Sequence, residues 1–359
     1  MIRTLRLENY RSFREYELRD LTRVNLLVGR NDCGKTSVLE AVELLASRGD
    51  PQVLVGSMRR RGEFHVTPDG RQIPQYPVYH QFHGHGIGIG SSLSISSDDG
   101  LGQVRIDVVE GWQDESHDLF DVSEAGLLPL ALLIRRGSEE ENLKYPLTQD
   151  GALAWSRSMP RRPPRPWRPT LPPAQFVTAE SLRPRDMAAL WDQVLVAGRE
   201  SEVESALRIL RPGLDSIHFL TGDAAGRAGG IVPGFKGGSR RAPIGSHGDG
   251  MRRLLAVSLS LVRAAGGFLL IDEIDTGLHW TVMEDMWKLV VGAAIESSIQ
   301  VFATTHSLDC IVGLASLLRD RPDLGEAVSV QKIERQLGHG VSFGRKDIVT
   351  AADLSIEMR

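Results

Sequence analysis

The segment Gly29–Thr36 constrains this chain more than any other. Its sequence, GRNDCGKT, fits the pattern G-x-x-x-x-G-K-[ST], in which the glycines let consecutive backbone N–H groups curl around phosphate oxygens. A short apolar run, Val24–Val28, precedes it, and Val38, Val42 and Leu45 follow with helical spacing. Such a run is typical of a strand buried on both faces of a parallel sheet. Strand, glycine loop and helix together predict an α/β fold that binds phosphate groups.

We expect the residues of this loop to bind ATP together with Mg²⁺. The Lys35 ammonium would act as a point charge on the β- and γ-phosphates, and the Thr36 hydroxyl would ligate the metal. The helix that begins near Lys35 adds the positive end of its dipole. The predicted ATP-binding residues are Gly29, Asn31, Gly34, Lys35, Thr36, Ser37 and Arg11.

A second motif, which is acidic, follows another apolar run, Phe268–Ile271. Asp272 at the carboxyl end of this predicted strand can hold Mg²⁺, directly or through water. Glu273 beside it can act as the general base that polarises the attacking water. An Asp-Glu pair after a strand is also common in ordinary turns. The prediction of a metal and general-base motif therefore depends on the glycine loop being present in the same chain.

The distance between the two motifs predicts the domain organisation. Asp272 lies 236 residues after Thr36, which is the layout of an ABC-type ATPase with a subdomain inserted between two halves of one sheet. The predicted fold class is therefore α/β, a P-loop NTPase of ABC-ATPase type, with a mixed sheet, an antiparallel β subdomain and a helical and loop insertion. We expect an N-terminal ATPase part over residues 1–90, the insertion over 91–235 and a C-terminal ATPase part over 236–359.

The insertion has three recognisable stretches. Short β-like runs fall at Leu93–Ile95, Val104–Val109 and Leu130–Ile134, and helical apolar spacing covers residues 180–212. The Gly- and Arg-rich stretch 222–241 is predicted to be loop. The Pro- and Arg-rich stretch 160–173 is either a solvated extended loop or a segment that binds a partner or nucleic acid.

A serine- and glycine-rich segment, Ser246–Gly250, comes directly before the helical pattern Met251–Ala265. Free N–H groups and the dipole at a helix start favour an anion, whereas the alternative is a plain N-cap with a flexible turn. In ABC-type dimers a segment at this place meets the γ-phosphate bound by the other subunit. We therefore predict Ser246, Gly248 and Gly250 as a signature acting in trans, and a head-to-tail homodimer or higher oligomer.

Two residues after the acidic motif complete the expected ATPase set. Asp275 lies at the spacing of a D-loop, and His306 follows the predicted strand Val301–Thr305, where a switch histidine would reach the γ-phosphate. A histidine after a strand is often only structural, and that alternative stays open. With Lys35 and Glu273, His306 makes up the predicted catalytic residues.

Two further residues have open interpretations. Gln81, in YHQFH, either senses Mg²⁺ like a Q-loop glutamine or is an unrelated glutamine in a short loop. Arg11, in NYRSF, either contacts the nucleotide or closes the turn after the first strand. The candidate metal site therefore comprises Thr36, Asp272 and Gln81.

Composition narrows the classes of protein that remain. The formal net charge of −4 argues against a generally basic nucleic-acid-coating protein, although a local arginine patch stays open. Two cysteines exclude a disulfide framework. The N-terminus lacks a signal-peptide core and no apolar run reaches membrane-spanning length, so we expect a cytoplasmic protein that does not enter the membrane.

The motifs NYRSF, GRNDCGKTS, SHGDGMRRLL, LLIDEIDTGLHW and QVFATTHSLDC resemble the OLD-like and RecF-like branch of ABC ATPases. The resemblance implies an ATP-driven switch in a DNA-related process, above all bacteriophage defence, and DNA as a partner. Full-length OLD nucleases carry a C-terminal TOPRIM domain, for which the 53 residues after His306 are too few. The resemblance therefore implies a separately encoded TOPRIM or nuclease-like effector. Alternatives are a RecF-like repair ATPase and an ATP-bound scaffold or sensor with negligible turnover.

Overall fold

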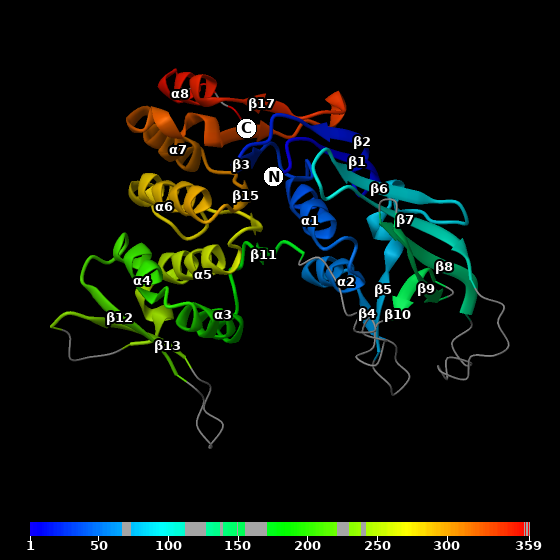
Figure 1. The fold of residues 1–359 in the computed structure, drawn as a ribbon, viewed down its shortest axis with the longest axis horizontal. Helices are drawn as coiled ribbons and strands as arrows, with labels where there is room; N and C mark the ends of the chain where they lie inside the picture. The colour runs from blue at the N-terminus through cyan, green and yellow to red at the C-terminus, as the bar shows by residue number, and fades with distance from the viewer. Residues whose placement is uncertain are drawn as a thin grey trace.

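The computed structural model describes residues 1–66, 73–111, 127–136, 139–148, 150–154, 171–220, 230–237, 242–354, 356 and 358. Figure 1 shows two masses of the molecule, one mostly helical and one built around a twisted antiparallel sheet. Residues 160–170 lie outside the described part, so both interpretations of the Pro- and Arg-rich stretch stay predictions.

A six-stranded sheet with the order β11-β14-β15-β3-β16-β17 forms the centre. Its strands are β3 Val24–Val28, β11 Ala174–Val177, β14 Phe268–Ile271, β15 Gln300–Thr304, β16 Val328–Lys332 and β17 Val341–Phe343. All neighbours are parallel except β17, which is antiparallel to β16. Every residue of β3, β14 and β15 is buried, because both faces of this sheet are covered.

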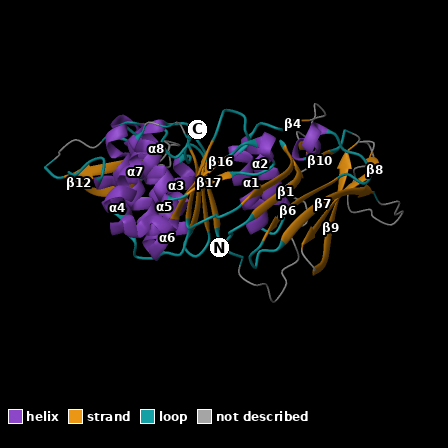
Figure 2. Ribbon diagram, turned by 90° about the horizontal axis from the view of Figure 1, so that it is seen from above, coloured by secondary structure: helices purple, strands orange, loops and turns teal. Residues whose placement is uncertain are grey.

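A second six-stranded sheet, wholly antiparallel, has the order β2-β1-β6-β7-β8-β9. Its strands are β1 Leu5–Tyr10, β2 Phe13–Leu18, β6 Ser92–Ser97, β7 Gln103–Glu110, β8 Leu127–Arg136 and β9 Glu139–Thr148. The predicted β runs within residues 91–136 are therefore confirmed. Figure 2 shows this sheet facing the central sheet, with α1 between them.

The helices cover the central sheet on both faces. They are α1 Lys35–Ala46, α2 Pro51–Arg60, α3 Pro184–Val196, α4 Glu200–Arg208, α5 Asp249–Arg263, α6 Met283–Glu296, α7 Leu308–Asp320 and α8 Arg345–Asp353. In β3, Leu27 points into the core shared with α1 and the antiparallel sheet. Its neighbour Leu26 points into the core shared with α3 to α8, because successive strand side chains face opposite ways.

Shorter strands complete the described part. They are β4 His65–Val66, β5 Pro74–Pro77 and β10 Ala152–Ala154 in one sheet, and β12 Leu214–Phe219 and β13 Ile231–Phe235 in a hairpin. The prediction that 222–241 is all loop is wrong for β13. Its sequence, IVPGF, contains Pro and Gly, which disfavour strands, and only pairing with β12 makes it one.

The sheets cross the sequence-based boundaries at residues 90 and 235. Strands β1 and β2, from the expected N-terminal part, open the antiparallel sheet that β6 to β9 continue. Strand β11, from the expected insertion, pairs with β14 in the central sheet. The edge of a sheet presents unpaired backbone N–H and C=O groups. In both sheets these groups pair with strands from distant parts of the chain. Among the described residues, no helix is long and apolar enough to cross a membrane.

Candidate functional site

The candidate site lies where the parallel strands β3, β14 and β15 end. A cavity of about 460 Å³ opens there, at the sheet edge where ligands of open α/β folds bind. Its wall includes eight of the predicted site residues: Arg11, Gly34, Lys35, Thr36, Ser37, Asp272, Glu273 and His306. The central sheet therefore brings together motifs that lie 236 residues apart in the chain.

The loop after β3 takes a shape that only glycine fits at two places. Gly29 has a φ of +142° and Gly34 a φ of +102°, values that side chains rarely adopt. A Cβ on Gly34 would meet the ring of Phe13 at 2.5 Å and Ser12 Oγ at 2.9 Å. Helix α1 begins at the next residue, so its free N–H groups open toward the cavity.

The Lys35 side chain folds back over its own loop. Its Nζ donates to the carbonyl oxygens of Gly29 at 2.8 Å and Arg30 at 3.0 Å, and lies 3.5 Å from His306 Nδ1. Burial lowers the pKa of Lys35 below its ordinary value. Burial, and then the Lys35 ammonium, lower the pKa of His306, which favours the neutral imidazole.

Thr36 and Asp272 meet directly. Thr36 Oγ1 lies 3.2 and 3.1 Å from the two carboxylate oxygens of Asp272. Thr304, at the end of β15, donates from its hydroxyl to Asp272 Oδ1 at 2.7 Å. The hydroxyl of one motif and the carboxylate of the other thus form one oxygen-rich corner of the cavity, although they come from different ends of the chain.

Glu273 sits in an uncommon backbone conformation for a residue with a side chain. Its φ is +51°, a region that usually costs about 1–3 kcal/mol and marks functional positions. Its backbone N–H donates to Thr304 Oγ1 at 2.8 Å, and Thr276 Oγ1 donates to its carboxylate at 3.2 Å. The turn after β14 therefore aims Glu273 along the cavity wall, where the sequence predicts the general base.

Asp275 lies outside this wall and is held by the next strand. Thr305 Oγ1 donates to Asp275 Oδ1 at 2.5 Å, and the Thr305 hydroxyl also accepts from the Ser307 N–H at 2.9 Å. The predicted D-loop is thus tied to the segment that carries His306. Three threonines make the contacts described above: Thr304 at the end of β15, Thr305 directly after it, and Thr276 in the turn after β14. The sequence did not mark them, because single threonines carry no distinctive pattern.

Arg11 lines the cavity but is already engaged. Its guanidinium pairs with Glu40 through Nε and with Glu63 through an Nη atom, each at 2.9 Å, and only 6% of the side chain is exposed. Arg61 also bonds Glu40 and donates to Ser37 Oγ at 3.1 Å. The turn Tyr10–Phe13 is therefore closed by a charge network, the second of the two interpretations of Arg11, while its place in the wall keeps the first open.

Gln81 is buried beside the cavity with an unusual amide. It is 1% exposed, and neither its Oε1 nor its Nε2 has a hydrogen-bond partner among the described residues. Its backbone oxygen accepts from the Arg11 N–H at 2.8 Å. Buried amides nearly always find partners, and Gln81 itself is not part of the cavity wall, although its sequence neighbours His80 and His83 are.

The Ser246–Gly250 segment lies apart from the cavity. Ser246 and Gly248 are exposed, and none of this segment is in the wall around Lys35. Gly248 caps α5 with a φ of +95° and no side-chain hydrogen bond. Asn31, in the glycine loop, is also exposed and outside the wall.

The wall also includes residues that the sequence did not mark as nucleotide contacts. His80, His83 and His85 come from the segment after β5, and Arg335 comes from the segment after β16. The His80 and His85 Nδ1 atoms are 3.4 Å apart, and His83 Nδ1 lies 3.1 Å from the Arg11 carbonyl oxygen. The sequence marked only Gln81 in the segment YHQFH, so the histidines on either side of it and Arg335 are revealed by the fold alone.

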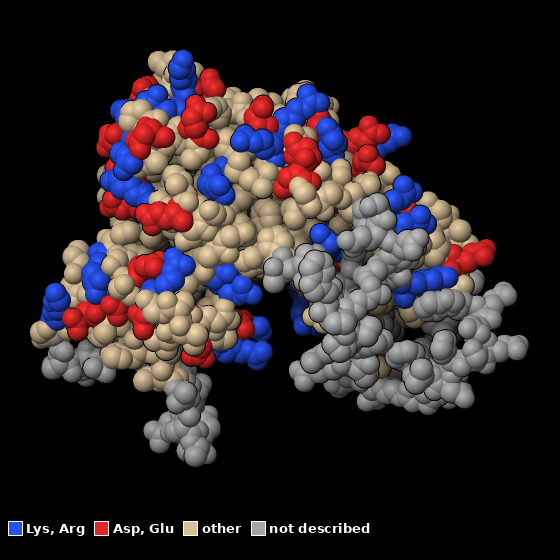
Figure 3. Space-filling model, in the orientation of Figure 1, with Lys and Arg blue, Asp and Glu red and all other residues tan. Residues whose placement is uncertain are grey.

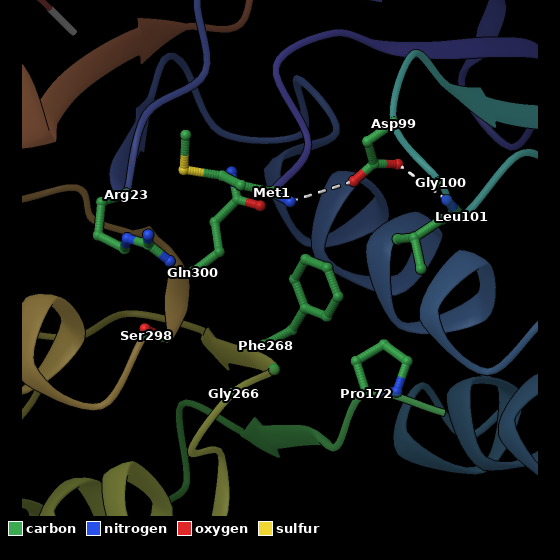
Figure 4. Close-up of a pocket in the computed structure, with 11 residues that line it drawn as sticks. Met1, Arg23, Asp99, Gly100, Leu101, Pro172, Gly266, Phe268, Ser298 and Gln300 are labelled. Atoms are coloured by element: carbon green, nitrogen blue, oxygen red, sulfur yellow. Dashed lines mark hydrogen bonds and ion pairs between the residues drawn. The ribbon is translucent and has the colours of Figure 1, made fainter. Parts of the chain in front are cut away.

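A second cavity, of about 220 Å³, lies at the opposite edge of the central sheet. Phe268 and Gln300 line it at the amino ends of β14 and β15 (Figure 4). The Met1 amino group lies 3.5 Å from Asp99 on its rim. Ligands of parallel sheets bind beyond the carboxyl ends of the strands, so the larger cavity is the candidate functional site.

The donors of the larger cavity suit Mg²⁺ and phosphates. Mg²⁺ takes few protein oxygens and keeps water or phosphate oxygens as its other ligands, which fits a single hydroxyl and carboxylate corner at Thr36 and Asp272. Among the described residues, no group of three or more His, Cys, Asp or Glu could hold a metal by itself. The Lys35 ammonium, which lies in the cavity wall beside two loop carbonyls and His306, also fits a bound anion.

Comparison with known proteins identifies the family to which this chain belongs. The profile described as "AAA domain, putative AbiEii toxin, Type IV TA system" matches residues 24–309. The chain belongs to this family. The match covers more than half of the chain and includes the glycine loop, the acidic motif and His306. The predicted fold class, a P-loop NTPase of ABC-ATPase type with a mixed sheet, is confirmed.

Individual relatives are distant. The chain is similar to a protein named ATP/GTP phosphatase from Helicobacter pylori, with 20% identity over 355 residues and 89% of each chain covered. Over 47 residues it is 40% identical to the uncharacterized protein MJECL10 from Methanocaldococcus jannaschii, covering 13% of this chain and 22% of that protein.

Solved structures similar to this chain are also distant in sequence. One is an SMC head bound to the C-terminal winged-helix domain of ScpA, with 14% identity, 96% of this chain and 98% of that chain covered, and a TM-score of 0.47. Another is RecF-ATPrS of the RecFOR pathway, with 10% identity, the same coverages and a TM-score of 0.41. The OLD-like part of the resemblance stays a prediction.

Proposed function

We propose that this protein binds ATP with Mg²⁺ and hydrolyses it to ADP and phosphate. The observation that carries the proposal is the convergence of Lys35, the Thr36–Asp272 pair and Glu273 on one cavity. Phosphate-binding loop, metal-binding hydroxyl and carboxylate, and general base are the parts that such a reaction needs. The relative named ATP/GTP phosphatase supports the same reaction.

Each side chain has a distinct task in this reaction. Mg²⁺, when bound, supplies positive charge to the phosphate oxygens. The Lys35 ammonium and the α1 N-terminus bind the phosphates, while Glu273 takes a proton from water as the water oxygen bonds to the γ-phosphorus. The bond from that phosphorus to the bridging oxygen breaks, and ADP leaves. His306, neutral because its pKa is lowered, would donate a hydrogen bond to the γ-phosphate.

We also propose that ATP closes a head-to-tail pair of chains. The exposed Ser246–Gly250 segment lies outside the cavity of its own chain, as expected if it completes the site of a second copy. Asp275, near the same surface through Gly277 and Gly250, would follow the closure. The output would be control of a nuclease-like effector in bacteriophage defence, which the toxin–antitoxin description of the family supports.

Glu273→Gln is the decisive variant for hydrolysis and closure. We expect it to bind ATP like the wild type, to release phosphate about 10²–10⁴-fold more slowly, and to run as a dimer on sizing chromatography with ATP and Mg²⁺. Wild-type phosphate release at the background rate would favour the scaffold alternative. A Glu273→Gln protein that stays monomeric with ATP would contradict closure.

Direct DNA binding is a separate proposal. On the face in Figure 3, Lys and Arg are interspersed with Asp and Glu over the described helices. Among the ion pairs of the described residues, Lys288 pairs with Glu284 and Arg321 with Asp323. The slope of DNA affinity against salt, with and without ATP, measures how many phosphates are contacted.

The role in defence is tested in cells. A bacterial strain that expresses the wild-type chain with its neighbouring genes should plate bacteriophage less efficiently than the same strain with Lys35→Ala. Equal plating by both strains would contradict a defence role, while increased sensitivity of the variant strain to DNA damage would favour the RecF-like alternative.

A further inference from the structure

One arginine is buried between the acidic motif and the helix that follows the Ser246–Gly250 segment. Arg253 lies in the second turn of α5 and is 2% exposed. Its guanidinium donates to the backbone oxygens of Thr178 at 2.5 Å, Asp272 at 2.6 Å and Glu273 at 2.7 Å. One side chain thus joins α5 to the carboxyl ends of two neighbouring strands, β11 and β14.

This burial is costly, and packing alone does not explain it. Burial lowers the pKa of Arg253 to about 10, so the side chain still carries its charge at neutral pH. Among the described residues, no carboxylate pairs with it at ion-pair distance, and its Nε has no partner. An apolar side chain of the same size would usually serve the core at least as well, so the contacts to the three carbonyls are its distinctive contribution.

The contact with Glu273 fixes a strained residue. The Glu273 N–H is held by Thr304 and its carbonyl oxygen by Arg253, so both sides of its left-handed backbone are restrained. A conformation of this kind persists only where its surroundings over-determine it. The direction of the Glu273 carboxylate therefore depends on where α5 places the guanidinium.

We propose that Arg253 is a positioning residue that couples the Ser246–Gly250 segment to the general base Glu273. The inference rests on the proposed ATP hydrolysis and names how that site is regulated. Helix α5 begins at Asp249, directly within the segment that would meet the nucleotide of a second copy. A shift of this helix end moves the guanidinium and, with it, the backbone of Glu273. Docking of the second copy thereby sets the alignment of the base in the first.

Arg253→Lys tests the coupling with little change of size or charge. A lysine is a point donor on a flexible stem and cannot span three carbonyls as a planar guanidinium does. We expect kcat to fall roughly 10- to 100-fold, since small misplacements of catalytic groups cost this much. KM for ATP and the affinity for a fluorescent ATP analogue should stay within about threefold, because no nucleotide-binding group has changed.

The matched control is Arg263→Lys, which changes an exposed arginine at the other end of the same helix. It should keep the wild-type kcat. Arg253→Met, which removes the charge, should lower kcat at least as far as Arg253→Lys. Should the methionine variant not fold, the lysine variant carries the test.

A double variant separates coupling from general damage. If Arg253 acts through Glu273, adding Arg253→Lys to Glu273→Gln should leave the residual rate unchanged, because the group it positions is already gone. Three results would each overturn the inference about Arg253 but leave the proposed hydrolysis intact. They are additive losses of kcat in the double variant, a wild-type kcat in Arg253→Lys, and a parallel loss of nucleotide affinity and Tm. A wild-type protein without turnover would overturn the proposed function, and the inference with it.

Discussion

Lys35 is the residue on which nucleotide binding depends most in the proposed function. Its ammonium is held 2.8 and 3.0 Å from two carbonyl oxygens of its own loop, in the wall of the cavity. Of the chain's six lysines, only this one lies in the cavity wall. Its sequence context predicted this place, because the glycine pattern specifies the backbone around it.

Replacing Lys35 by alanine should abolish tight ATP binding. The loss of charge-assisted contacts to phosphate, each about 1.5–3 kcal/mol, should weaken affinity at least ~10- to 100-fold. Isothermal titration calorimetry with ATP and Mg²⁺ measures it. Lys288→Ala, on the exposed face of α6, removes the same charge elsewhere and should bind normally. Equal affinities of the two variants would contradict the role of Lys35.

His306 should make folding stability depend on pH. Burial and Lys35 lower its folded pKa below the usual value of about 6.5, so the unfolded chain binds the proton more readily. His306 therefore does not affect the free energy of unfolding well above pH 6.5. It lowers that free energy increasingly as the pH falls from about 6.5 toward the folded pKa.

Replacing His306 by glutamine should remove that part of the pH dependence. We expect the fall in Tm between about pH 7.5 and pH 5.5 to be smaller in His306→Gln than in the wild type, as followed by differential scanning fluorimetry. An equal or larger fall in the variant would show that the imidazole does not carry the effect. His279→Gln, an exposed histidine, serves as the control.

At the scale of elements, the buried strands were the most predictable part. Strands β3, β14 and β15 stand where continuous apolar runs indicated them, because a strand covered on both faces must be apolar throughout. Strands β11 and β13 were not predicted. The runs AQFV and IVPGF are short and undistinguished, and they become strands only through pairing with β14 and β12.

The junction of β3 and α1 should tolerate no side chain at Gly34. In Gly34→Ala, a Cβ would have to share space with Phe13 and adopt an unfavourable φ, which we expect to cost about 1–3 kcal/mol and to weaken ATP binding. Chemical denaturation and nucleotide titration measure both effects.

Gly62→Ala is the matched control for this junction. Gly62 has a φ of +70°, and a Cβ at this position would meet no atom within 4 Å, so the variant carries the backbone strain without the clash. It should lose stability but keep ATP affinity. Loss of affinity in Gly62→Ala as large as in Gly34→Ala would contradict the role of the close contact with Phe13.

At the scale of the whole molecule, the head-to-tail pair makes a complementation test available. Lys35→Ala would disable the loop of its own site, and Ser246→Arg would disable the segment offered to the other copy. Mixed in equal amounts, these inactive chains should regain about a quarter of wild-type phosphate release, because half of the dimers are mixed and each has one intact site. No gain over the separate variants would contradict shared sites.

The sequence by itself determined the fold class and the main site residues. Glycines at fixed spacing, a lysine, and carboxylates after a buried run carry local information, since each needs a particular residue type at a particular place in one strand–loop–helix unit. Lys35, Thr36, Asp272, Glu273 and His306 all line the cavity as this reasoning expected.

Only the tertiary structure decided which distant residues support them. Thr304 orients the acidic motif and Arg253 holds its backbone, while Thr305 holds Asp275. Glu40 and Glu63 engage Arg11. These contacts join residues from separate strands and helices, whose side chains are ordinary in sequence. Their roles arise because a parallel sheet gathers the carboxyl ends of strands at one edge, a proximity that no local pattern encodes.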